Sequence, residues 1–123
     1  MIEMLSDMPE GVTGIRVSGR LSGEELRGIK PTVAGMFDSG GEIRILEVID
    51  EDYEGFGPGG LVEDLKLGLG TVLPHYATLK RTAIVSDKDW VAHAVHALAW
   101  MVPGEVAVFG LDEIDRAKQR AAG

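Results

Sequence analysis

The chain has 123 residues, which is near the commonest size of one domain, and 45% of them are hydrophobic. It has no cysteine, which excludes disulfides and thiolate metal sites and favours a cytoplasmic location. Its net charge is −8, and the only adjacent bases are Lys80 and Arg81. An acidic chain with scattered bases repels polyanions, so we expect no nucleic-acid partner and at most transient membrane contact.

The N-terminal segment predicts a β-hairpin. Short apolar runs over 2–5 and 12–17 flank the turn-forming residues 7–11. Glu3 and Asp7 replace the basic residues that a secretory signal would need, so no such signal is predicted.

A helix is predicted over 23–37. Ser22 and Glu25 have the spacing of a capping box, and apolar residues then recur at helical intervals. Pro31 lies inside this pattern and should kink or loosen the helix.

The middle of the chain predicts a buried strand, a long loop and a second helix. The apolar run over 42–50 is typical of a central strand with two buried faces. A loop is expected over 51–60, and leucines at helical spacing predict a helix over 61–73.

The last third predicts two more strand–helix pairs. We expect strands over 82–85 and 106–109, and helices over 88–101 and 112–121. Asp87 is expected to cap the first of these helices, whose inner face would include Trp90 and Val91. The order predicts one α/β domain over 1–123, with a mixed sheet of four to five strands, a hairpin followed by parallel βαβ units, and about four helices.

Glycines 55, 57 and 60 satisfy the Gly-x-Gly-x-x-Gly pattern of dinucleotide sites. Nearby carboxylates would repel a pyrophosphate, and Pro58 removes one N–H from the cradle. A flexible hinge or lid is therefore preferred for this tract, with the hinge at Gly55, Gly57, Gly59 and Gly60.

Other polar groups suggest chemistry only weakly. Four carboxylates over 50–54 lack EF-hand spacing, and His93 and His96 lack further zinc ligands nearby in the sequence. Ser86 sits between a strand and a helix, where a capping role with Asp87 accounts for it. No catalytic residue, metal or cofactor is predicted.

Taken in order, several segments make the chain resemble the SpoIIAA-like family, which is related to STAS and CRAL-TRIO domains. These segments are 17–22, Pro31, 43–49, the aromatic loop 53–56, 63–68, 80–90 and 105–118. The resemblance implies a mixed sheet with overlying helices and a non-enzymatic role. It also implies that a small ligand or a protein partner binds between the sheet and movable helices.

The loop after the central strand departs from the pattern of the regulatory STAS antagonists. They carry a phosphorylated serine there, whereas this chain has acidic residues and Tyr53, with no serine or threonine before Thr71. The resemblance therefore implies partner binding without a phosphorylation switch.

The leading hypothesis is a cavity for a small apolar or lipid-like ligand, with 61–73 as the mobile element. Its expected lining residues are Tyr53, Phe56, Leu61, Leu65, Leu69, Trp90 and Trp100. Leu65, Leu69 and Trp90 are equally explained as core, whereas aromatics in a glycine loop lack an obvious packing role. The alternative is a protein-interaction module, either a homodimer or an adaptor for a regulator. An enzyme using a nucleotide or a metal is the least favoured hypothesis.

Overall fold

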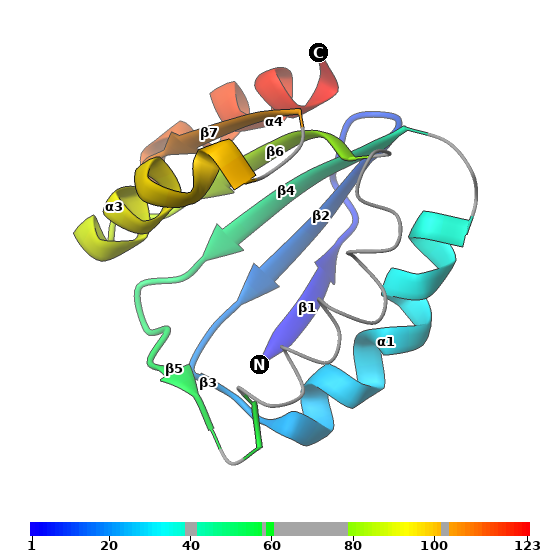
Figure 1. The fold of residues 1–123 in the computed structure, drawn as a ribbon, viewed down its shortest axis with the longest axis vertical. Helices are drawn as coiled ribbons and strands as arrows, with labels where there is room; N and C mark the ends of the chain where they lie inside the picture. Colours follow the sequence, from blue (N-terminus) through cyan, green and yellow to red (C-terminus); the bar gives the residue numbers. More distant parts are fainter. Residues whose placement is uncertain (39–41, 58, 61–78, 102–103) are drawn as a thin grey trace.

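The computed structural model describes residues 1–38, 42–57, 59–60, 79–101 and 104–123. Its centre is a five-stranded sheet in the order β1-β2-β4-β6-β7 (Figure 1). The strands are β1 (Ile2–Leu5), β2 (Val12–Val17), β4 (Ile43–Ile49), β6 (Leu79–Val85) and β7 (Glu105–Phe109). β1 pairs antiparallel with β2, and the remaining pairs are parallel. The predicted hairpin and mixed sheet are therefore confirmed.

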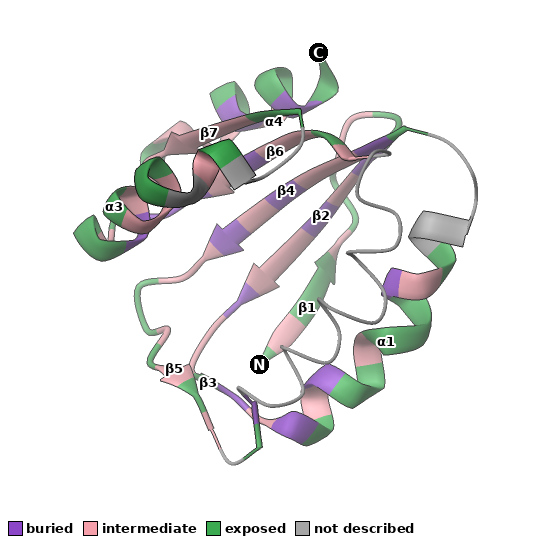
Figure 2. Ribbon diagram, in the orientation of Figure 1, coloured by how far each residue is buried: buried purple, intermediate pink, exposed green. Residues whose placement is uncertain are grey.

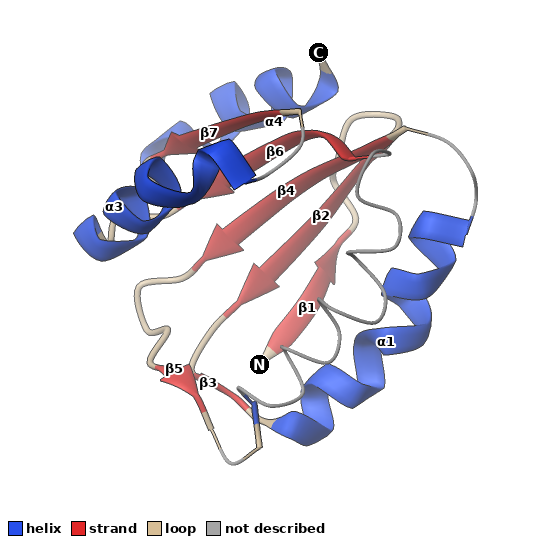
Figure 3. Ribbon diagram, viewed as in Figure 1, coloured by secondary structure: helices blue, strands red, loops and turns tan. Residues whose placement is uncertain are grey.

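Helices cover both faces of this sheet, as Figure 3 shows. The helical elements are α1 (Gly23–Asp38), α3 (Asp89–Leu98), η3 (Ala99–Met101), η4 (Leu111–Glu113) and α4 (Ile114–Ala122). The terminal helix α4 lies against one face, and α1 and α3 lie on the other. Among the described residues, no helix is long and apolar enough to cross a bilayer.

The capping box predicted before α1 is confirmed. The backbone N–H of Glu25 donates to Ser22 Oγ over 3.2 Å, and the N–H of Ser22 donates to Glu25 Oε2 over 3.4 Å. These bonds satisfy N–H groups that have no partner within the helix. The helix then continues through Pro31.

The core on the α4 face is built from small helical residues against large strand residues. Ala117 and Ala121 of α4 are fully buried, as are Leu46 and Val48 of β4 and Val85 of β6 (Figure 2). Small side chains let the helix backbone approach the sheet closely, which closes this face.

Two arginines of the sheet fix the C-terminal end of α4. Arg44 donates to the carbonyl oxygen of Ala121 over 3.2 Å, and Arg81 donates to that of Arg120 over 3.1 Å. The last carbonyls of a helix lack intrahelical partners and carry partial negative charge, so cations there are stabilising.

The opposite face is packed less completely in the described residues. Leu26 of α1 packs with Val17 and Leu21 in one cluster, and Val33 of α1 packs with Ile43 in another. The half-buried residues around these clusters include Ile15, Ile29, Ile45 and Ile49.

Three elements differ from the sequence expectations. The expected loop over 51–60 contains a short strand, β5 (Gly55–Phe56), which pairs with β3 (Arg20–Leu21). β6 begins at Leu79 rather than at residue 82. The charged residues Lys80 and Arg81 interrupt the apolar pattern from which the strand was predicted. The last helix begins with a 3-10 turn, and the helix expected over 61–73 lies outside the described residues.

Candidate functional site

The loop after β4 is held against the segment that follows β2. The N–H of Asp50 donates to the carbonyl of Val17 over 3.0 Å, and that of Glu54 donates to Gly19 over 2.7 Å. The β3–β5 pairing continues these contacts, with Arg20 opposite Gly55. The two loops therefore form one connected unit at the carboxyl ends of β2 and β4.

The glycine tract is attached to the same unit. The N–H of Gly57 donates to the carbonyl of Leu21 over 2.7 Å, and that of Gly60 donates to Gly57 over 3.0 Å. A Cβ on Gly60 would lie 2.0 Å from the Leu21 carbonyl oxygen, so this position requires glycine for close approach. Gly55 and Gly59 have positive φ angles of 97° and 73°. A hinge at these glycines remains a proposal.

These bonds also bear on the nucleotide alternative. A pyrophosphate cradle needs backbone N–H groups directed at the ligand. The N–H groups of Gly57 and Gly60 instead donate to carbonyl oxygens of the chain. In this structure the tract is used for chain packing.

Tyr53 and Trp90 form a stacked aromatic pair between the loop and the first turn of α3. Their ring centroids are 6.4 Å apart, with an interplanar angle of 29°. Tyr53 is half-buried against the Val17–Leu21–Leu26 cluster, whereas Trp90 is 58% exposed. The prediction that Trp90 lies on the inner face of its helix is therefore wrong, and its neighbour Val91, at 3% exposure, is buried instead.

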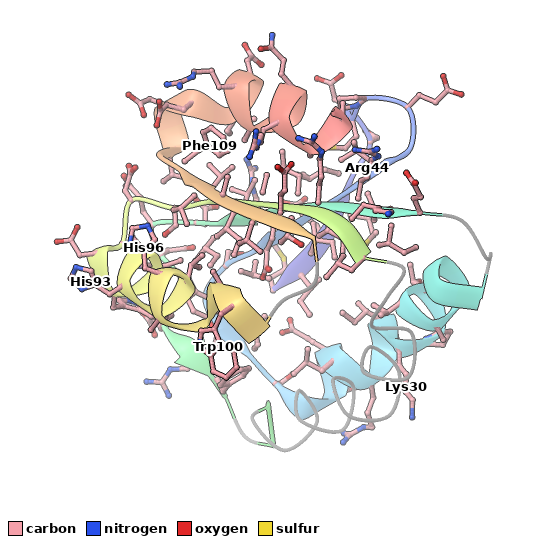
Figure 4. The ribbon with its side chains drawn as sticks, turned by 45° about the horizontal axis from the view of Figure 1, so that its top comes forward. Lys30, Arg44, His93, His96, Trp100 and Phe109 are labelled. Atoms are coloured by element: carbon pink, nitrogen blue, oxygen red, sulfur yellow. The ribbon has the colours of Figure 1, made fainter. Side chains whose placement is uncertain are left out.

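The other predicted lining residues are separated. Phe56 on β5 is 37% exposed and Trp100 on η3 is 80% exposed. Figure 4 shows Trp100 at the end of α3, directed away from the sheet, with His93 and His96 on the outside of the same helix. Leu61, Leu65 and Leu69 lie outside the described residues. We use the name aromatic surface for Tyr53 and Trp90.

Acidic residues lie close to Tyr53 and Trp90 in the sequence. Glu51 and Asp52 are exposed on the loop, and Asp87 and Asp89 are exposed on either side of Lys88. Lys88 Nζ donates to the backbone carbonyl of Glu51 over 2.9 Å, which ties the start of α3 to the loop. The surroundings are therefore net negative, as is the whole chain.

The expected role of Asp87 is corrected by its contacts. The residue preceding α3 is Lys88, and its side chain makes no capping hydrogen bond to that helix. Asp87 Oδ1 instead accepts from the N–H of Leu111 over 2.9 Å, and so fixes the start of η4. Ser86 is buried, and its Oγ accepts from the N–H of Lys88 over 3.1 Å.

A metal centre is not assembled by the residues that the structure describes. No three His, Asp or Glu side chains come together there in a way that could hold an ion. The acidic loop and the two histidines therefore remain surface groups.

A second feature, a groove beside α4, was not predicted from the sequence. Its lining includes Arg81, Arg116 and Arg120. The spacing of Arg116 and Arg120, one helical turn apart, is visible in the sequence. Arg81 joins them through the packing of α4 on β6, where it donates to the carbonyl of Arg120, and no local sequence pattern reveals this contact.

Comparisons with known proteins agree on the fold. A family model described as SpoIIAA-like matches residues 12–119. An uncharacterized protein from the DUF3478 family with a SpoIIAA-like fold, from Shewanella loihica PV-4, is similar in structure with a TM-score of 0.73. It is 24% identical, and the match covers 98% of this chain and 92% of that one.

A second solved structure is more distant. SpoIIAA, a Bacillus cell fate determinant solved in its phosphorylated form, gives a TM-score of 0.58 at 15% identity. The match covers 94% of this chain and 98% of that one. No curated protein matches the chain.

Proposed function

Because this chain belongs to the SpoIIAA-like family, we propose that it is a non-enzymatic regulatory domain that binds a protein partner through the aromatic surface. The partner presents an apolar patch with basic residues around it. The observation that carries this proposal is Trp90, which stacks on Tyr53 and yet leaves 58% of its surface exposed.

The stack gives the exposed ring a fixed position. Tyr53 is anchored by the core cluster beneath it, and Trp90 is attached to the first turn of α3. A rigid aromatic side chain loses little conformational freedom on binding, and tryptophan and tyrosine are enriched among residues that dominate interface energies. An exposed and preorganised pair is therefore suited to a protein interface.

The charge around the pair favours a basic partner. Exposed Glu51, Asp52 and Asp89 border the aromatic side chains. Complementary charges at the rim of an interface raise the association rate and select among partners. The proposed complex should consequently weaken as ionic strength rises.

A photo-crosslinking experiment tests this proposal. A photoreactive phenylalanine analogue replaces Trp90 in one variant and Met4, which is 45% exposed on β1, in a control variant. We expect one discrete partner adduct from position 90 in lysate of the source cells and none from position 4. The captured partner is then purified, and its affinity is measured by calorimetry.

Two further variants decide whether the aromatic surface carries the binding. Trp90→Ala should weaken the affinity for the purified partner about 30-fold, as expected for a central aromatic residue. Trp100→Ala, at the far end of the helix, should leave it unchanged. Equal affinity of the wild-type protein and Trp90→Ala, with both folded by circular dichroism, would refute the proposal.

A small apolar or lipid-like ligand is the second candidate. The observation in its favour is the α1 face of the sheet, where Ile15, Ile45 and Ile49 remain only half-buried. In this proposal Gly55, Gly57, Gly59 and Gly60 act as a hinge, and the ligand contacts Tyr53 and Phe56. Native mass spectrometry of the purified protein should then detect a lipid-sized adduct, and a bare polypeptide mass would count against this ligand.

A further inference from the structure

A groove runs along the side of α4, above the edge strand β7. Its volume is about 630 Å³. Residues 107–109 of β7 form one wall, and Arg81, Arg116 and Arg120 contribute guanidinium groups. None of these residues belongs to the aromatic surface, so binding in this groove is independent of the function proposed above.

The groove exists because α4 packs over the middle of the sheet. Ala117 and Ala121 face the core. Arg116 and Arg120 precede them by one residue each, so both arginines lie along the side of α4 that faces β7. Figure 4 shows Phe109 close to the start of α4, and the Arg116 guanidinium carbon lies 6.0 Å from the centre of its ring.

Among the charged side chains at the groove, three guanidinium groups pair with two carboxylates. Arg81 and Arg120 share a single carboxylate, that of Glu105, at 3.1 Å and 3.7 Å. Arg116 pairs with Glu113, and the side chain of Arg116 remains 71% exposed. In a chain of net charge −8, these side chains form a local cluster in which basic groups outnumber acidic ones.

The backbone of β7 adds a second recognition element. β7 is the last strand of the sheet, and the carbonyl of Phe109 accepts from the N–H of Ser86 beyond the end of β6. The N–H and C=O of one strand residue point to the same side, and the side alternates along the strand. The N–H and C=O of Val108 therefore point away from β6, along the groove edge.

From these two observations we propose that the groove binds an extended acidic peptide of another protein, which adds a strand to the edge of β7. Backbone hydrogen bonds to Val108 would align the peptide with the sheet. Alternate side chains of the added strand would then point to the α4 side, where a Glu or Asp meets Arg116 and Arg120.

The test uses a fluorescein-labelled synthetic peptide in which Val and Glu alternate, and an otherwise identical peptide with Gln in place of Glu. Fluorescence anisotropy measures both affinities for the full chain. We expect the Glu peptide to bind about tenfold more tightly, as charge-assisted hydrogen bonds predict. Equal affinities of the two peptides would overturn the proposal.

Matched variants separate the charge from the backbone contribution. Arg116→Gln should abolish the preference for Glu, whereas Lys118→Gln, the same charge change on the opposite side of α4, should preserve it. Val108→Pro removes an N–H that the β6 ladder does not use, and should weaken both peptides about tenfold.

Several results would overturn the inference. Equal losses with Arg116→Gln and Lys118→Gln would reduce the effect to net charge. Unchanged binding by Val108→Pro, together with competition by inorganic phosphate, would identify a small-anion site. A dimer of the unliganded protein that Val108→Pro converts to a monomer would show that a second copy occupies the edge.

Discussion

The glycine tract offers the sharpest test of the local structure, because two of its glycines differ in what surrounds them. A Cβ on Gly57 would meet its nearest atom, Arg20 Cβ, at 3.5 Å, which is ordinary contact. A Cβ on Gly60 would lie 2.0 Å from the carbonyl oxygen of Leu21 and 3.1 Å from Phe56 Cβ. Neither glycine has a positive φ, so neither substitution places an alanine in the left-handed region.

The expected magnitudes are set by these contacts. Gly60→Ala forces the backbone away from Leu21 and disturbs the hydrogen bonds of Gly57 and Gly60, which should lower the free energy of unfolding by about 3 kcal/mol. Gly57→Ala introduces no clash and restricts the unfolded chain, so it should raise that free energy by about 0.5 kcal/mol.

Thermal unfolding followed by circular dichroism measures both effects. The Tm of Gly60→Ala should fall by about 10 °C, and that of Gly57→Ala should stay level or rise slightly. Gly55→Ala, at a φ of 97° with open space around it, measures the cost of the backbone angle separately. Equal Tm shifts for Gly57→Ala and Gly60→Ala would refute the close-packing argument and favour a tract that simply flexes.

Three further tests of the scaffold use urea unfolding. Leu46→Ala, at a fully buried position of β4, should lower the free energy of unfolding by about 3 kcal/mol. Met4→Ala, at a position that is 45% exposed, should lower it by about 0.5 kcal/mol or less. Similar losses in the two variants would contradict the assigned core. Asp87→Ala removes the acceptor of the Leu111 N–H and should cost about 1 kcal/mol, and a neutral result would show that this bond adds nothing. Ser22→Ala removes the cap of α1 and should also cost about 1 kcal/mol, which Ser22→Asp should recover; no recovery would argue against capping as the cause.

The larger elements could be predicted because their sequence patterns have a single physical explanation. The apolar run of β4 is buried on the α4 side through Leu46 and Val48 and packs on the other side through Ile43. The Ser22–Glu25 box marked the start of α1 because the partners are only three residues apart. Local patterns and nearby partners are readable without knowledge of the fold.

Features that depend on distant partners were not predicted. Asp87 bonds to a residue 24 positions later, so its sequence neighbours suggested the wrong role. The β3–β5 pair consists of two-residue strands, which are too short to show an alternating pattern. The spacing of Trp90 predicted a position on the apolar face of the helix, but its ring stacks on Tyr53 outside the core.

The two faces of the sheet differ in how tightly they are packed, and this difference indicates on which face an apolar ligand would bind. On the α4 side, Ala117 and Ala121 press against Leu46, Val48 and Val85, and every one of these side chains is buried almost completely. An apolar guest could enter between these side chains only if α4 separated from the sheet, which would expose the core cluster.

Under the ligand alternative, we expect the ligand to enter on the α1 side, where the isoleucines are half-buried and Tyr53 packs against the Val17–Leu21–Leu26 cluster. Partner binding at Trp90 and guest binding beneath it would then involve the same stacked pair from its two sides. A substitution that removes only the exposed ring, Trp90→Ala, should weaken a protein partner and leave an interior guest in place. Tyr53→Ala should affect both, because it removes the ring that supports Trp90 and borders the α1 side.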